Sequence, residues 1–162
     1  MRTTGITRLH DRALEPVARC LIRHLMVPDV YFEATFPGRR ANTDIVLIDR
    51  AGAGDVHLVE VKVAIDKALA AIPVLLRVPA HYRWVACFGH TISDRTRAHL
   101  RRGEGLLPPT GAGRIGVIEV IRSEPDDLTA GILVNAERFL EPVDPEALRA
   151  FADRHPPSIR FD

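Results

Sequence analysis

43-TDIVLID-49 and 56-VHLVEVKV-63 are two apolar stretches that lie close together in the chain. Their β-branched residues are typical of strands, and Gly52 and Gly54 between them predict a turn. The second stretch carries Glu60 and Lys62, two charges in an otherwise apolar strand. The sequence therefore predicts a β-hairpin whose second strand holds charge for a reason other than solubility.

Side chains alternate between the two faces of a strand, so Glu60 and Lys62 share one face. The first strand opens with Asp44, and a turn near Gly52 would bring that carboxylate roughly opposite Glu60. Two carboxylates and one ammonium group are thus expected to converge at one end of the sheet.

Carboxylate oxygens are hard ligands that select Mg²⁺ or Mn²⁺. A bound Mg²⁺ keeps several waters and takes further ligands from a substrate phosphate, so two carboxylates can anchor it. A neighbouring lysine can position the attacking water, help to deprotonate it, or stabilise charge on the phosphate. This combination of residues favours phosphodiester hydrolysis.

Outside the hairpin, helical and strand patterns alternate along the chain. The order α-β-β-β-α-β-α-β predicts an α/β domain in which helices flank a mixed sheet. We expect one domain over residues 1–162, with a core at about 7–122 and C-terminal additions at 123–162. Helices are expected at 7–26, 64–78, 94–102 and 145–154, and further strands at 30–36, 81–88, 115–121 and 132–134.

The composition is that of an ordinary globular protein, with 46% hydrophobic and 27% charged residues among 162. The net charge of +1 provides no overall basic field, so nucleic-acid binding would need a local patch. No segment approaches the roughly 20 apolar residues of a membrane span, and the first residues do not resemble a signal peptide. We expect a soluble cytoplasmic protein. Cys20 and Cys87 are expected to be core residues in a reducing compartment, with a disulfide left open.

The pattern Asp44-x15-Glu60-Val61-Lys62, on a hairpin that follows a helix and a strand, resembles the PD-(D/E)XK nuclease superfamily. This superfamily has a restriction-endonuclease-like αβββαβ core and includes restriction endonucleases, Holliday-junction resolvases and many repair and defence nucleases. The resemblance covers the first half of the chain well and the remainder loosely. Thr43 stands where the family usually has proline.

The resemblance implies that Asp44 and Glu60 are metal ligands, that the Val61 backbone carbonyl is a third ligand, and that Lys62 is the catalytic lysine. Many members add a glutamate from the first helix. Glu15 is the slightly favoured candidate for that role, and Glu33 on the preceding strand is the alternative.

The function implied is a Mg²⁺- or Mn²⁺-dependent nuclease, a hydrolase that acts most naturally as a DNA endonuclease in repair or defence. RNA remains an alternative substrate, and a homodimer or larger assembly is an alternative to a monomer. The second hypothesis is a nuclease-like module without catalysis that binds nucleic acid or a protein partner. Candidate phosphate contacts are Arg39, Arg40, Lys67, Arg77 and Arg83.

Other polar and aromatic residues are expected to be structural. His57 should face away from Glu60, and the seven histidines show no zinc-like spacing. Tyr82 and Trp84 are expected to pack in the core rather than to stack on bases. Glu119 lies inside an apolar strand, and its place at an edge or near the site is left open.

Overall fold

The expected hairpin forms the middle of the sheet in the computed structural model, which describes residues 4–26, 28–39, 41–51, 54–104, 113–140 and 142–160. Strand β2 (Thr43–Asp49) pairs in antiparallel fashion with β3 (Val56–Val61), with Ile45 opposite Val59. All six residues of β3 are buried. The hairpin is therefore covered on both faces.

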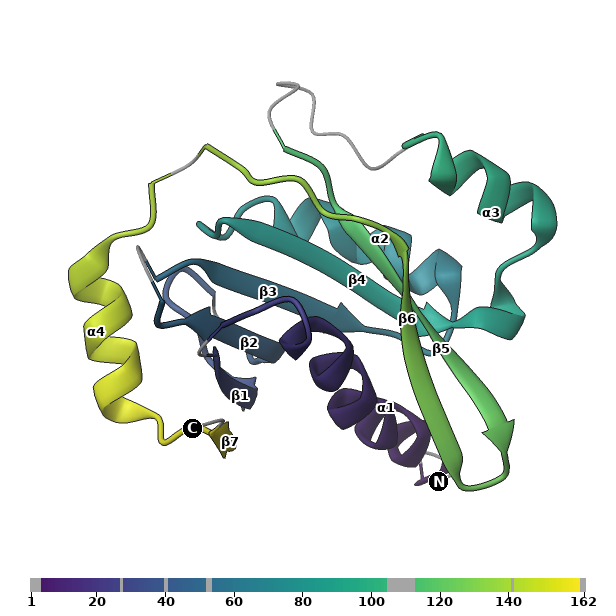
Figure 1. The fold of residues 1–162 in the computed structure, drawn as a ribbon, viewed down its shortest axis with the longest axis horizontal. Coiled ribbons are helices and arrows are strands. Elements are labelled where there is room, and N and C mark those ends of the chain that lie inside the picture. The colour runs from purple at the N-terminus through teal and green to yellow at the C-terminus, as the bar shows by residue number, and fades with distance from the viewer. Residues whose placement is uncertain are drawn as a thin grey trace.

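Within the described ranges the sheet has seven strands in the order β6-β5-β4-β3-β2-β1-β7 (Figure 1). Strands β3, β4 and β5 run parallel, and the other neighbours pair antiparallel. The sheet is thus mixed, as expected. The remaining strands are β1 (Pro28–Ala34), β4 (Tyr82–Phe88), β5 (Gly116–Glu124), β6 (Asp127–Val134) and β7 (Ile159–Arg160).

Helices cover both faces of this sheet (Figure 1). Helix α1 packs its apolar stripe on one face, in a cluster that includes Leu14, Val17 and Leu21. Helix α2 lies on the other face. The helices are α1 (Thr4–Ile22), α2 (Ile65–Leu75), α3 (Asp94–Arg101) and α4 (Pro145–Arg154), with a 3₁₀ turn, η1, at Gly89–Thr91.

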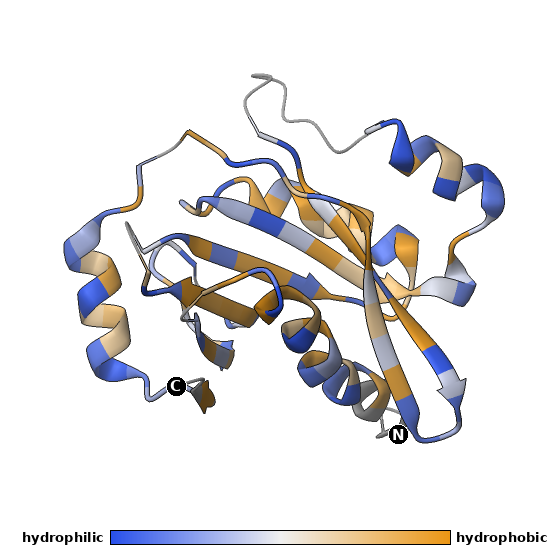
Figure 2. Ribbon diagram, in the orientation of Figure 1, coloured by the Kyte–Doolittle hydropathy of each residue, from blue (hydrophilic) through white to orange (hydrophobic). Residues whose placement is uncertain are grey.

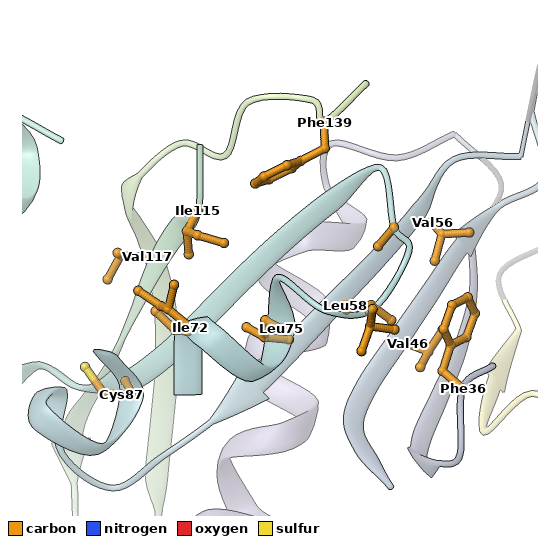
Figure 3. Close-up of a cluster of buried hydrophobic side chains, with 14 of the residues drawn as sticks. Phe36, Val46, Val56, Leu58, Ile72, Leu75, Cys87, Ile115, Val117 and Phe139 are labelled. Atoms are coloured by element: carbon orange, nitrogen blue, oxygen red, sulfur yellow. The ribbon is translucent and has the colours of Figure 1, made fainter. Parts of the chain in front are cut away.

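Two apolar cores follow from the alternation along the strands. Figure 3 shows the α2 side, where Ile72 and Leu75 of α2 belong to the same buried cluster as Leu58 of β3. The α1 side contains Val59 and Val61 from the same strand. Apolar residues run along the central strands, whereas α3 is mainly hydrophilic (Figure 2). The alternation of β3 thus separates the two cores, and it places Glu60 on the α2 side.

The C-terminal part differs most from the expected elements. Strand β6 has eight residues where the sequence indicated only 132–134, and it forms a long antiparallel hairpin with β5. Its first residues, Asp127 to Gly131, include Asp and Gly, which are depleted in strands, and pairing with β5 extends the strand through them. The expected tail after His155 ends in β7, which pairs with β1. Helix α1 also begins earlier than expected, at Thr4, and it continues through Pro16 to end at Ile22, before the expected residue 26.

Arg83 is fully buried, so the expectation that it contacts phosphate is wrong. Its Nε donates to the Leu75 carbonyl at 2.9 Å and its Nη2 to the Val78 carbonyl at 2.6 Å. The guanidinium also lies 4.2 Å from the centre of the Phe139 ring. Arg83 therefore binds the carbonyl groups at the C-terminal end of α2, where a cation is favourable.

The two cysteines are free thiols buried in different cores, Cys20 on the α1 side and Cys87 on the α2 side. Burial raises the pKa of the Cys87 thiol to about 11. Both are core residues, as expected. No helix in the described part of the chain combines the length and apolarity needed to cross a bilayer.

Candidate active site

Asp44 and Glu60 meet at the ammonium group of Lys62. The β2–β3 register pairs Ile45 with Val59, and one further step sets Asp44 opposite Glu60. Lys62 Nζ lies 2.9 Å from Glu60 Oε2 and 3.4 Å from Asp44 Oδ2. The two carboxylates therefore share one cation, at the end of the sheet where β3 stops.

A second cation lies on the same glutamate. Arg39, from the connection between β1 and β2, forms an ion pair with Glu60 Oε1 and also contacts the Thr43 hydroxyl at 3.3 Å. The Arg39 side chain is only 11% exposed, and that of Glu60 7%. Arg39 is thus a component of the site, and contact with phosphate remains a prediction.

Asp44 is held from two further directions. The Val61 backbone N–H donates to Asp44 Oδ2 at 2.7 Å, and His10 Nε2 of α1 lies 3.3 Å from Asp44 Oδ1. Every carboxylate oxygen of Asp44 and Glu60 therefore faces at least one donor of this chain. The role of the Val61 carbonyl as a ligand remains a prediction.

The carboxylates change the acidity of both nitrogen bases beside them. Burial alone would lower the pKa of Lys62, but hydrogen bonds and charge from Glu60 and Asp44 outweigh it and raise that pKa. Burial also opposes the charged form of His10, yet Asp11 and Asp44 together raise its pKa. Lys62 is accordingly an ammonium at neutral pH.

An open groove of about 650 Å³ leads to this cluster. It lies at the end of the sheet between the first half of α1 and the start of α2. One wall contains small side chains of α2, Ala70 and Ala71, and the floor contains Val61 and Lys62. A groove of this size and openness leaves one side of the charged cluster accessible from solvent.

The two candidates for a third carboxylate lie in different places. Glu33 lines the groove, and its backbone has the left-handed φ of 50°. A non-glycine residue in that region stores strain of about 1–3 kcal/mol, and such strain is concentrated at functional sites. Glu15 instead pairs with Arg19 at 2.7 Å and lines another hollow, beside the β5–β6 hairpin. The geometry favours Glu33 over Glu15.

The remaining candidate residues also lie partly in the groove and partly outside it. Lys67 of α2 lines the groove. Arg77 lies beyond the far end of α2 and is exposed there, about 15 Å along the helix axis from Lys67. Arg40 lies outside the described residues. Glu119 forms an ion pair with Arg97 at 2.6 Å, which accounts for its charge within a strand.

A divalent cation fits the chemistry of this donor set. Asp44 and Glu60 already converge on a cation, the ammonium of Lys62, and carboxylate oxygens are the ligands that Mg²⁺ and Mn²⁺ prefer. No group of three or more His, Cys, Asp or Glu side chains suited to a metal is found among the described residues. The protein ligands would thus be few, with water and substrate completing the shell.

Sequence reasoning did not assign His10 or Arg39 to this cluster as partners of Asp44 and Glu60. His10 precedes Leu14 by four residues and so extends the apolar stripe of α1, which is the signal that could have identified it. Arg39 lies in an irregular connection, and no periodic pattern indicates its partner.

Comparison with known proteins gives a likeness of fold. No family model matches the chain, and no curated protein sequence matches it. A solved structure, a protein of unknown function from Silicibacter pomeroyi, is similar with a TM-score of 0.55 and 15% identity. The match covers 90% of this chain and 82% of that one. The shared α/β architecture therefore extends over nearly the whole chain.

Proposed function

We propose that this protein is a metal-dependent nuclease with a restriction-endonuclease-like core, and that DNA is its substrate. The observation that carries the proposal is the convergence of Asp44 and Glu60 on Lys62 at the edge of an open groove. The element order α1-β1-β2-β3-α2-β4 supports it, because it is the αβββαβ order of that superfamily.

The chain's own residues have separate tasks in this proposal. Asp44 and Glu60 would hold Mg²⁺ or Mn²⁺, with the Val61 carbonyl as a further ligand. When bound, the ion polarises the scissile phosphate and lowers the pKa of its water. The Lys62 ammonium donates to the attacking water or to a phosphate oxygen. Arg39 holds Glu60 in place, and His10 does the same for Asp44.

The test measures cleavage of duplex, single-stranded and branched DNA and of RNA, with Mg²⁺, with Mn²⁺ and with a chelator. Glu60→Gln and Lys62→Met keep the side-chain size and should lower metal-dependent cleavage by about a hundredfold or more. A wild-type protein inert on all four substrates would contradict the proposal.

Two glutamates provide a matched control within the same assay. Glu33→Gln changes a carboxylate of the groove, and Glu15→Gln changes one outside it. We expect cleavage to fall in the first variant and to stay within about twofold of wild type in the second. The reverse result would assign the third carboxylate to α1.

The second candidate function is a binding module without catalysis. It is favoured by the donors that every oxygen of Asp44 and Glu60 already faces, because a metal ion would have to share or displace them. This hypothesis predicts that labelled DNA binds with the same affinity in Mg²⁺ and in a chelator and stays intact. Affinity that rises with Mg²⁺ together with cleavage would exclude it.

A further inference from the structure

A second hollow, of about 360 Å³, lies at the opposite end of β3 from the charged groove. Leu21, at the end of α1, and Leu25, just after it, line the hollow together with Ile132 of β6. Tyr82 and Trp84, at the start of β4, line it as well. It therefore has apolar contributions from three separate elements, and its volume falls within the range of small-ligand sites.

Three nearly parallel rings form part of its lining. The His57 and Tyr82 ring centres are 4.4 Å apart with planes inclined by 11°, and the His57 and Trp84 centres are 6.4 Å apart at 15°. Tyr82 is the most exposed of the three rings, since His57 and Trp84 are each only 5% exposed, so a planar ligand ring would pack chiefly against Tyr82. The aliphatic side chains of the lining add apolar contacts that any planar ligand ring could make. The shape of the lining thus favours a flat ligand.

His57 supplies one hydrogen-bond donor, and its contacts identify which ring nitrogen carries the proton. The indole Nε1–H of Trp84, which can only donate, contacts His57 Nδ1 at 3.2 Å. Burial lowers the pKa of His57 to about 4, so the ring is neutral at pH 7 and its single proton must lie on Nε2. That N–H makes no hydrogen bond to any described residue. A donor is therefore left over in the lining of the hollow.

Acceptors lie in the same lining. Asp55 pairs through Oδ1 with Arg138 at 3.0 Å, and its Oδ2 takes no hydrogen bond from the described residues. Asp49 and the amide of Asn135 also line the hollow. A ligand that fits must combine donors and acceptors on its edge. Two carboxylates in one hollow also disfavour a ligand that carries phosphate.

We propose that this hollow binds a purine, as the free base or the nucleoside. A purine is planar and carries donors and acceptors around its edge. Guanine suits the site best, because its adjacent ring N–H and amino groups match a carboxylate such as Asp55, while its acceptors match the His57 N–H. The proposal is independent of nuclease activity, since it uses none of the residues of the groove.

The single tryptophan of the chain, Trp84, reports on this hollow directly. Guanosine, adenosine, cytidine and GMP are titrated into the full chain while Trp84 emission is followed, and calorimetry gives a second measurement. Guanosine should cause a saturable change and bind at least tenfold more tightly than cytidine or GMP. No saturable signal for either purine nucleoside by both methods would overturn the proposal.

Two substitutions locate the binding. Ala136→Leu fills part of the hollow and should weaken guanosine at least tenfold, whereas Glu60→Gln, at the other end of β3, should leave it unchanged. If Ala136→Leu does not fold, Asp55→Asn removes the acceptor charge at a partly exposed position, with a similar loss expected. Wild-type affinity in the folded Ala136→Leu or Asp55→Asn protein, or equal loss in Glu60→Gln, would overturn the assignment.

Discussion

Each end of β3 buries an ionisable side chain, and the two ends compensate for that burial in different ways. Counted over the whole residue, His57 and Glu60 are each 5% exposed, and they stand three residues apart in one strand. Glu60 is compensated by two cations, Arg39 and Lys62, whereas His57 is buried among aromatic rings with its charged form disfavoured. A buried ionisable group must be paired or neutral. Of these two residues, only Glu60 is held by ion pairs.

The largest expected effect on stability comes from removing Glu60, at the end of β3 where the ionisable group is paired with cations. Glu60→Ala leaves Arg39 and Lys62 without their shared partner, and breaking a buried ion pair costs about 3–5 kcal/mol. Chemical denaturation should show this loss. As a control, Glu15→Ala removes an exposed i,i+4 pair and should change the free energy of unfolding by less than about 0.5 kcal/mol. Equal values for both variants would show that the cluster is not a stabilising unit.

His57, at the neutral end of β3, should make the stability of the protein depend on pH below neutrality. In the unfolded chain His57 titrates near 6.5, but in the folded chain near 4, so the unfolded state takes up the proton first. Stability should therefore fall between pH 6.5 and 4, by about 3 kcal/mol from this residue. His57→Phe should remove that part of the slope, while the exposed His24→Phe should keep it. The free energy of unfolding measured across this range tests the sign.

At the His57 end of β3, close packing rather than charge restricts which side chains the structure can accept. A Cβ on Gly116 would overlap the indole of Trp84, so Gly116→Ala must displace the ring that donates to His57. Overpacking of this kind costs about 1–3 kcal/mol, and Trp84 emission should shift with it. Gly131→Ala, in the neighbouring strand β6, meets nothing within 4 Å and is the matched control. A wild-type emission spectrum for Gly116→Ala would contradict this packing.

The sequence predicted what depends on local pattern. Strand β2 runs over residues 43–49 as expected, because its β-branched residues lie between turn signals. The position of Asp44 opposite Glu60 also followed, since a short turn determines the register. Arg39 and His10 could not be placed, because their approach depends on how a connection and α1 pack on the sheet. Strand β6 was mostly missed because pairing with β5 overrides its weak local preference.

The smallest effect on stability is expected from the rim of the groove. Lys67 is exposed, so Lys67→Ala should change the free energy of unfolding by less than about 0.5 kcal/mol. If nucleic acid binds along the groove, this lysine neutralises a phosphate, and its loss should reduce the slope of log K against log salt by about one.

Arg77→Ala is the matched control for this measurement, because the residue is also exposed but lies beyond the far end of α2. Fluorescence anisotropy at several salt concentrations gives the slope for both variants. A change in the slope for Lys67→Ala alone would locate the phosphate contacts at the charged end of β3. A change for Arg77→Ala alone would mean that nucleic acid approaches the other end, where the carboxylates of Asp49 and Asp55 oppose it. In that case the His57 end of β3, and not the Glu60 end, would be the one that faces nucleic acid.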